Sequence, residues 1–431
     1  MKKILSILMA LTIVILFALT WYYSRKTEQL FTAQIIAINQ AAPELIKVEL
    51  KNYQRKLFAA QAETAIRIGG EKEVQFNHQI RHFVWGVQMV TTLAPDSALA
   101  NEIATIIPLE KLQLTTDFSL SGTSKSRLIL PQFELKIDSG RLKITGFSAG
   151  WDLNADLSSG NFVSFLDNLQ LQQADQGELN LVNLKISTQM ADLQGIPLGE
   201  GELQLEKLQL MSRGESDIEF QNIQYRGQAD LNQDVFSSVT ELSFSQLLLA
   251  GESLSDGRLN LSLTGIDAEL LRSLQQTKEQ LQRQVFDQQV SSIELQLQLF
   301  ALYTELLSSG MILNLEDFSL QTANGAVKGT GKLALLEKTA TKGSLFSLQN
   351  VEGSFHLEID QGAFVAGYRL FNKLQSGEGQ YQNPAILVEQ AEQIAGGLVQ
   401  KGIFVQQDGD RFRIDFSWAE GQGKLNGKLL E

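Results

Sequence analysis

One spacing pattern recurs along this chain and limits the fold that it can adopt. Two apolar residues separated by one position are followed, after two further residues, by a second pair of the same kind. Side chains alternate between the two faces of a strand, so a bulge or short turn at the middle positions would return all four apolar residues to one face. The pattern occurs at Ile107/Leu109/Leu112/Leu114, Leu179/Leu181/Leu184/Ile186, Leu203/Leu205/Leu208/Leu210, Ile218/Phe220/Ile223/Tyr225, Leu242/Phe244/Leu247/Leu249 and Leu313/Leu315/Phe318/Leu320.

These copies favour a repeated strand unit over chance spacing in leucine-rich amphipathic strands. They begin at irregular intervals, which argues against a solenoid of fixed period. Short strands in the same region end at turns rich in Gly, Asp and Ser, such as Asp138-Ser139-Gly140 and Ser158-Ser159-Gly160. We therefore expect an α+β, mostly β fold with long twisted antiparallel sheets.

The amino-terminal segment Ile4–Tyr23 is almost entirely apolar, with Ser6, Thr12 and Thr20 as its polar residues. As a helix rising about 1.5 Å per residue, it would span the ~30 Å hydrocarbon core of a bilayer. The aromatic cluster Trp21–Tyr23 suits a membrane interface. A cleaved signal peptide is the alternative, but the apolar run is longer than a usual signal-peptide core and no Ala-x-Ala site follows it. We expect an uncleaved transmembrane anchor over residues 1–26.

The chain after the expected anchor is strongly acidic, whereas the basic residues on the two sides of the apolar run hardly decide its orientation. The 431 residues carry a formal net charge of −13. The first 26 residues hold four of the 36 basic residues and none of the 49 acidic ones, so the remainder has a net charge of −17. Nucleic acid would repel such a body, so we expect no nucleic-acid partner. We expect a single-pass protein of the bacterial inner membrane with its bulk in the periplasm.

Helical spacing predicts four helical segments among the strands. Asp267 is expected as the N-cap of the third segment and Gly310 as its C-terminal stop. That segment has an apolar stripe typical of packing on a sheet, with a break near 290–292. The four segments are Thr27–Ala41, the weaker Phe83–Ile107, Asp267–Ser308 and Pro384–Lys401.

Four regions follow from these segments. Residues 1–26 form the anchor, 27–266 a mainly β region, 267–310 a helical insertion and 311–431 a carboxy-terminal β region with one helix. The last region is expected to close with a hairpin, whose strands are 403–407 and 412–418, and with an edge strand through Leu425 and Leu429.

Several motifs in a shared order resemble those of the YdgA-like bacterial proteins of unknown function. Tyr53–Ala60 reads YQRKLFAA and is similar to that family's Tyr-x-Arg-Gly-Leu-Phe-Ser-Ser block. Ile196–Gly199 is similar to its central Pro-Leu turn, and a carboxy-terminal helix, Gly402, hairpin and Leu425–Gly427 follow in the family's order. The resemblance implies an anchored periplasmic protein and a homodimer, and it supplies no catalytic residues.

The chain also departs from that family. Lys56 stands where the family has glycine, Ala59 and Ala60 stand where it has serines, and Gln79 follows His78 where the family tends to have glycine. The strand units are weakly similar to those of AsmA-like envelope proteins, whose sheets curl into lipid-holding grooves.

No residue pattern predicts a catalytic, cofactor-binding or metal site. His78 and His82 would share a helix face and could bind one ion, but Gln79 stands where a zinc protease needs its glutamate. Two surface or loop histidines are the simpler interpretation. His356 lies between Phe355 and Leu357, which places it on the solvent face of a strand. The G-x-S-x-G spacing of a nucleophile elbow occurs at Gly146–Gly150, but no helical pattern follows it, as such an elbow requires.

The missing catalytic signature favours a non-enzymatic, membrane-anchored envelope protein that acts by binding or assembly. A first alternative is binding of a lipid or other apolar ligand in a β-groove, because an apolar strand face suits both a core and a groove. A second alternative is a hydrolase of an envelope polymer, suggested by the location and by the plentiful carboxylates.

Overall fold

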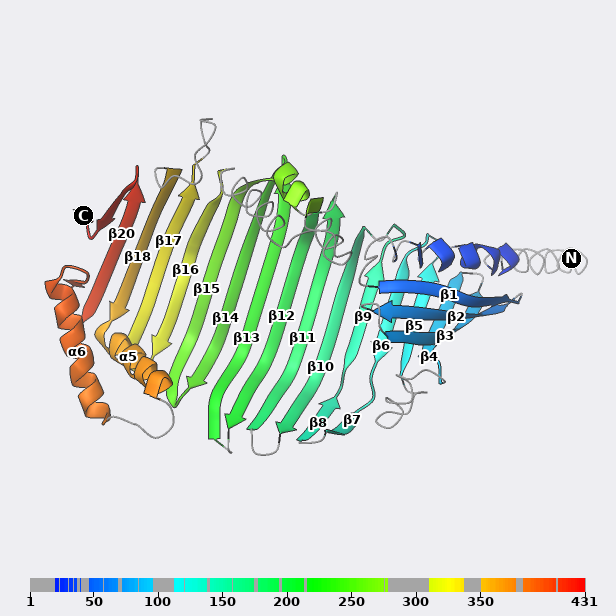
Figure 1. Cartoon of the computed structure of the whole chain (residues 1–431), viewed down its shortest axis with the longest axis horizontal. Helices are drawn as coiled ribbons and strands as arrows, with labels where there is room; N and C mark the ends of the chain where they lie inside the picture. Colours follow the sequence, from blue (N-terminus) through cyan, green and yellow to red (C-terminus); the bar gives the residue numbers. More distant parts are fainter. Residues whose placement is uncertain are drawn as a thin grey trace, which may run out of the picture. The chain divides into compact units, whose positions relative to one another are not determined.

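The computed structural model of the chain is mostly β, and its strands pair antiparallel (Figure 1). The chain divides into two compact units: residues 1–137 with 141–167, and residues 138–140 with 168–431. The structure describes residues 20–22, 24–29, 31–33, 35–36, 39, 46–56, 58–68, 72–83, 85–95, 112–119, 121–137, 140–156, 158–173, 177–193, 196–212, 215–274, 276–277, 310–336, 350–376, 383–407 and 410–430.

The first unit is built on a sheet in which β1 to β6 pair in sequence order and β6 then pairs with β9, which pairs with β10. The boundary between the units falls within β10. The strands are β1 (Ile46–Arg55), β2 (Ala59–Ile68), β3 (Lys72–Phe83), β4 (Gly86–Leu93), β5 (Gln113–Ser119), β6 (Ser124–Ile129), β7 (Phe133–Ile137), β8 (Gly140–Thr145), β9 (Ser148–Leu153) and β10 (Ser159–Gln173).

A helical segment packs on this sheet and forms the core of the first unit. The described residues between 20 and 39 are helical, as the sequence predicts for Thr27–Ala41. Phe31 is buried with Ala60, Ile80 and Met89 from β2, β3 and β4. Asn39 fixes the far end of the segment, because its side chain both donates to the Val48 carbonyl and accepts from the Val48 amide, at 2.8 and 2.7 Å.

The predicted membrane anchor lies almost wholly outside the described residues, which begin at Thr20. Within the described part of the chain, no helix is long and apolar enough to cross a bilayer. The helix predicted over Phe83–Ile107 is wrong where it is described, because residues 86–93 form β4. Val87, Met89 and Leu93 are buried at alternate positions, which is the period of a strand. Residues 96–111 lie outside the described part.

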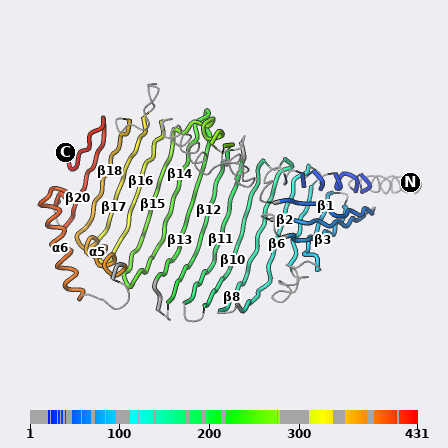
Figure 2. The backbone as a smooth tube through the Cα atoms, in the orientation of Figure 1, coloured from blue at the N-terminus to red at the C-terminus, as the bar shows by residue number. Residues whose placement is uncertain are grey.

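The second unit contains the longest strands, and Figure 2 shows them following one another in sequence order. β11 to β18 pair successively, and β18 then pairs with β20. The elements are β11 (Gly177–Leu193), β12 (Ile196–Ser212), β13 (Glu215–Asn232), β14 (Val235–Leu249), β15 (Glu252–Asp267), β16 (Ile312–Thr322), β17 (Gly325–Leu335), β18 (Val351–Asp360), α5 (Gln361–Ser376), α6 (Pro384–Gln400), β19 (Val405–Gln407), β20 (Arg411–Ala419), β21 (Gln422–Leu425) and β22 (Lys428–Leu429).

A line of backbone irregularities crosses these strands at the middle of the repeated pattern. Asn183 and Asn222 have positive φ angles of 53° and 52° at the second middle position of their copies. Asp256 in β15 also has a positive φ, of 48°. In β11, β12 and β13 the pairing skips one residue of each strand at the same level of the sheet. The register is therefore the same on both sides of the skipped residues. In β16 the register shifts between Leu315 and Phe318. The predicted interruption at the middle pair is confirmed in these strands, and the first copy lies partly outside the described residues.

Asp267 caps the helical residues 268–274, as predicted. Its carboxylate accepts hydrogen bonds from the Glu269 and Leu270 amides at 2.7 and 3.1 Å. Ala268 is fully buried with Ile196 and Leu198, so this helical turn packs on the sheet. Residues 278–309, which hold the rest of the predicted insertion, lie outside the described part.

The described residues of the carboxy-terminal region form two helices where the sequence predicted one. α6 and the β19–β20 hairpin are confirmed. α5 was missed because its glycines, Gly362 and Gly367, weaken the helical pattern. The predicted edge strand through Leu425 and Leu429 is instead the β21–β22 hairpin, whose turn residues Asn426 and Gly427 have φ angles of 51° and 79°.

Candidate functional site

An unbroken row of apolar side chains crosses nine strands of the second unit. Residues paired directly across antiparallel strands project from the same face of a sheet. The row has one glycine, and none of its other residues is buried. Its members, each paired with the next, are Ile186, Leu203, Tyr225, Leu242, Leu259, Phe318, Gly329, Leu357 and Ile414.

Further apolar rows run beside the first on the other side of the backbone irregularities. One row pairs Leu181, Leu208, Phe220, Leu247 and Leu254. The rings of Phe220 and Phe244 meet edge to face at 5.7 Å, and Phe244 lies across the irregularity from Phe220. The two sides therefore share one surface, which we call the leucine-rich face. A third row consists of Leu179, Leu210, Ile218 and Leu249.

The opposite side of the same strands is polar. One row there pairs Lys185, Gln204, Gln224, Ser243, Arg258, Ser319, Lys328, Glu358 and Arg413. Lys207 and Glu219 form an ion pair at 3.2 Å between β12 and β13 on this side. The sheet therefore has one face suited to water and one that is not, which is the amphipathic arrangement the repeated pattern predicts.

Aromatic rings cover glycines on the leucine-rich face. Phe244 and Phe355 lie over their cross-strand partners Gly257 and Gly331. The ring positions are shown by the contact that a Cβ at either glycine would make with the ring. Trp418 covers Gly423 in the same way. A ring lying on a cross-strand glycine covers the glycine backbone and helps to fix the register of the two strands. Sequence reasoning missed these pairs, although glycines at apolar-face positions of strands were an available signal.

In the part of the chain that the structure describes, the leucine-rich face is only partly exposed, and Leu205, Leu247 and Leu254 on it are buried. At its β20 end, Ile414 packs against a buried cluster of Ala395, Phe404 and Phe412, so α6 covers that end. Leu242, near the centre, has 38% of its surface exposed. Monomeric soluble proteins rarely expose large contiguous apolar patches, so this face is a candidate for binding.

The three histidines lie on the strands β3 and β18. His78 and His82 lie on β3, not on a helix, and both are buried, so the surface interpretation was also wrong. The ring nitrogens of His78 lie 2.7 and 2.8 Å from the hydroxyls of Thr64 and Thr91, and burial lowers its pKa to about 4. His356 is on the polar face as predicted, 2.6 Å from the Asp415 carboxylate.

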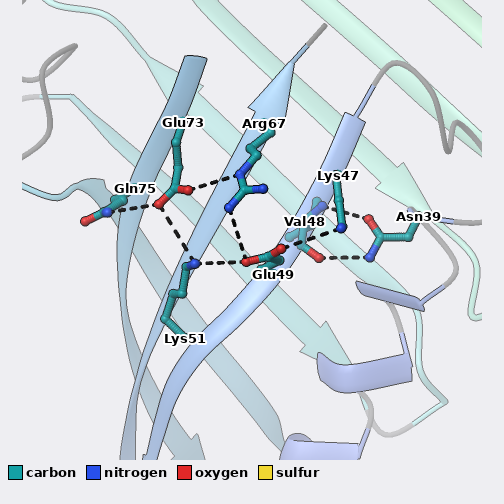
Figure 3. A network of polar contacts seen from close by, with 8 residues as sticks. All are labelled: Asn39, Lys47, Val48, Glu49, Lys51, Arg67, Glu73 and Gln75. Carbon is teal, nitrogen blue, oxygen red and sulfur yellow. Dashed lines mark hydrogen bonds and ion pairs between the residues drawn. The ribbon is translucent and has the colours of Figure 1, made fainter. Parts of the chain in front are cut away.

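Charged residues of β1 to β3 form a surface network that joins three strands (Figure 3). Lys51 bonds to Glu49 at 2.8 Å, and Arg67 bonds to Glu73 at 3.1 Å and approaches Glu49 at 3.8 Å. The hydrogen bond from Lys51 is the largest cause that lowers the pKa of Glu49, and hydrogen bonds from Gln75 and Arg67 lower that of Glu73. These carboxylates are acceptors held ionised, and their arrangement ties strands together.

Among the described residues, no three His, Asp or Glu side chains are grouped so that they could hold a metal ion. A search of the curated proteins finds no match. A family model described as "Bacterial protein of unknown function (DUF945)" matches residues 1–431, and the chain therefore belongs to this bacterial family.

Proposed function

We propose that this chain is a non-enzymatic binding protein of the bacterial envelope that holds lipid acyl chains on its leucine-rich face. The observation that carries the proposal is the apolar row from Ile186 to Ile414, which crosses nine strands and in which Gly329 is the one buried member. At about 4.8 Å between strands, nine strands give a width of about 40 Å. Two or more extended acyl chains fit within such a width.

The chemistry of the face favours hydrocarbon over a protein partner. Protein interfaces rely on Trp, Tyr and Arg anchors with hydrogen bonds, and leucine is under-represented among their energetic centres. In the row from Ile186 to Ile414, Tyr225 carries the single polar side-chain atom. A surface of aliphatic groups gives non-directional attraction, which suits a flexible chain without polar groups of its own.

The carboxylates favour binding over hydrolysis. A glycosidase-type general acid needs a carboxyl group whose pKa is raised. In the described part of the chain, every carboxylate with a resolved pKa shift is shifted downward, as at Glu219 and Asp360, where hydrogen bonds from Gln221 and from the Ala326 amide are the largest causes. Such groups stay ionised at neutral pH and cannot donate a proton there.

The proposed location is the inner membrane, with residues 4–23 as a single-pass anchor and the body in the periplasm. The apolar run and its aromatic end support this location. Within its family, we propose that the chain is a relative of the YdgA-like proteins, on the order of motifs from Tyr53–Ala60 to Leu425–Gly427. A homodimer remains part of this proposal.

Native mass spectrometry of the full-length protein extracted in detergent, with lipid analysis of the same sample, tests the proposal. Leu242 and Ser243 are neighbours on β14 that project from opposite faces of the sheet, so they offer matched variants. Leu242→Glu places a charge on the leucine-rich face and is expected to lose the bound lipid. Ser243→Glu places the same charge beside Arg258, its cross-strand partner, and is expected to keep it.

The outcomes separate the possible occupants of the face. Bound phospholipid that Leu242→Glu removes and Ser243→Glu retains supports the proposal. A lipid-free dimer that Leu242→Glu converts to monomer would contradict it, because a second copy of the chain would then cover the face. A lipid-free monomer in the unsubstituted protein would also contradict it.

A further inference from the structure

The turns of two hairpins in the first unit meet the start of the helical segment that follows the proposed anchor. The β1–β2 and β3–β4 turns lie at the same end of the sheet, where the His82 amide donates to the Phe58 carbonyl at 2.9 Å. The Ser24 hydroxyl donates to the Lys56 carbonyl at 3.1 Å. The chain therefore reaches this end of the sheet within a few residues of the apolar segment.

Large aromatic side chains are exposed at this end. Trp85 is 70% exposed and stacks on Phe83 with ring centroids 5.4 Å apart. Phe58, in the neighbouring turn, is 53% exposed, and Trp21 and Tyr22 are 55% and 52% exposed. Tryptophan and tyrosine are enriched at membrane interfaces because one part of the side chain is apolar and another is polar.

Basic side chains accompany these rings, although the body as a whole is acidic. Within the described residues of 20–29, 54–59 and 81–86, the basic ones are Arg25, Lys26, Arg55, Lys56 and Arg81, and the one acid is Glu28. The guanidinium of Arg25 lies 5.7 Å from the Trp21 ring centroid, and the Lys26 ammonium lies 5.8 Å from that of Tyr22. Cations beside aromatic rings match a layer that contains both lipid phosphates and acyl chains.

We propose that this end of the first unit rests in the interfacial layer of the bilayer. The surface consists of Trp21, Tyr22, Phe58 and Trp85 with Arg25, Lys26, Lys56 and Arg81, and we call it the tip surface. Its aromatic rings lie at the depth of the lipid headgroups, and its cations lie against the phosphates. The inference rests on the proposed anchor, since the apolar residues 4–19 directly precede the tip surface in the chain.

This placement would fix the orientation of the first unit relative to the membrane. The helical segment is fixed to the sheet through Phe31 and through the Ser24 contact, so the first unit does not hang on a free linker. A bilayer that holds Trp21 and Trp85 together would set the orientation of the first unit relative to the membrane. A single anchor alone would leave the unit free to rotate and tilt.

Depth measurement on the full chain in nanodiscs of zwitterionic and anionic phospholipid tests the tip surface. The chain has no cysteine, so a nitroxide can be placed at one chosen residue. A label at Phe58→Cys is expected to be reached by oxygen more than by a water-soluble nickel complex. A label at Gln75→Cys, an exposed position farther along β3, is expected to show the reverse.

Tryptophan quenching by brominated phospholipid provides a second measurement without a label. Trp21→Phe is expected to retain quenching, and Trp21→Phe/Trp85→Phe is expected to lose most of it, which assigns the quenched residue as Trp85. Protein that enters nanodiscs with the Phe58 label in water and without Trp85 quenching overturns the tip surface while the anchor stands. Protein that does not enter nanodiscs overturns the anchor and this inference with it.

Discussion

The ring of Phe244 occupies the space above Gly257, its cross-strand partner on β15, so that a Cβ at position 257 would overlap ring atoms. The same ring meets Phe220 edge to face across the line of backbone irregularities. Phe244 therefore links the two halves of the leucine-rich face by lying down on the sheet. Glycine at position 257 is a requirement of the face, because any larger residue there lifts the ring.

Gly257→Ala is expected to destabilise the second unit by about 1–3 kcal/mol, the usual range for overpacking. Gly201→Ala is the matched control, since its Cβ would meet Thr188 Cγ2 at 3.6 Å, an ordinary contact. Urea unfolding of both variants measures the difference. Equal stability of the two variants would show that the Phe244 ring moves aside without cost.

The sequence predicted local features within each strand better than it predicted the pairing register between strands. The apolar pairs on either side of Asn183 and Asn222 required a backbone change at these positions, and the structure has it there. Asp267 as an N-cap was predictable because capping uses local hydrogen bonds. The register that aligns Leu203 with Tyr225 depends on pairing between distant segments, and no local pattern specifies it.

Errors arose where tertiary contacts override local preference. Met89 sits in a segment with helical spacing, yet neighbouring strands on both sides make it part of β4. The sequence predicts His78 at the surface because its ring is polar, whereas the hydroxyls of Thr64 and Thr91 bond to its ring nitrogens in the core. The tip surface was invisible in the sequence, because Phe58 and Trp85 are brought together by the fold.

Substitutions at Asn222 test whether the positive φ at the backbone irregularity restricts which residue can stand there. Its φ of 52° is tolerated by asparagine and glycine and disfavours β-branched residues, and its side-chain amide donates to Ser245 at 2.9 Å. Asn222→Val is expected to cost about 2 kcal/mol of unfolding free energy, whereas Asn222→Gly loses the hydrogen bond alone and is expected to cost about 1 kcal/mol or less. Denaturant unfolding ranks the two variants, and a Val variant as stable as the Gly variant would contradict the strain at this position.

The lowered pKa of His78 predicts how the unfolding free energy of the first unit depends on pH. Burial lowers its pKa from 6.5 to about 4, so the unfolded chain binds a proton at a higher pH than the folded chain does. The contribution of neutral His78 is complete above pH 6.5 and falls as the pH drops toward 4. Between pH 7.5 and pH 5, this group alone is expected to remove about 2 kcal/mol from the unfolding free energy of the first unit.

The variant His78→Gln separates this effect from other acid effects. It cannot titrate, so its loss of stability over the same pH interval is expected to be about 2 kcal/mol smaller than that of the unsubstituted protein. Denaturant unfolding at both pH values, followed by tryptophan fluorescence, provides the comparison. Parallel losses in the two proteins would show that protonated His78 is accommodated in the fold.

Glu252 bonds α5 to the β14–β15 turn, and we expect these bonds to contribute to the stability of the helix on the sheet. Its carboxylate accepts from Arg369 at 3.0 Å and from Lys373 at 2.9 Å, and Lys373 also donates to the Ala250 carbonyl at 3.1 Å. All three charged side chains are largely shielded from solvent, so these bonds are less screened than surface ion pairs. Glu252→Gln removes the charge while keeping the shape, and it is expected to cost about 1–2 kcal/mol of local stability.

Hydrogen exchange measures that loss where it occurs. Amides of α5 are expected to exchange about tenfold faster in Glu252→Gln, since 1.4 kcal/mol corresponds to a factor of about ten, while those of β20 keep their rates. Asp152→Asn is the control for a screened pair, because Lys125 and Asp152 are both well exposed, and it is expected to leave α5 unchanged. Unchanged α5 exchange in Glu252→Gln would mean that apolar contacts such as Phe364 with Phe404 hold the helix without the ion pairs.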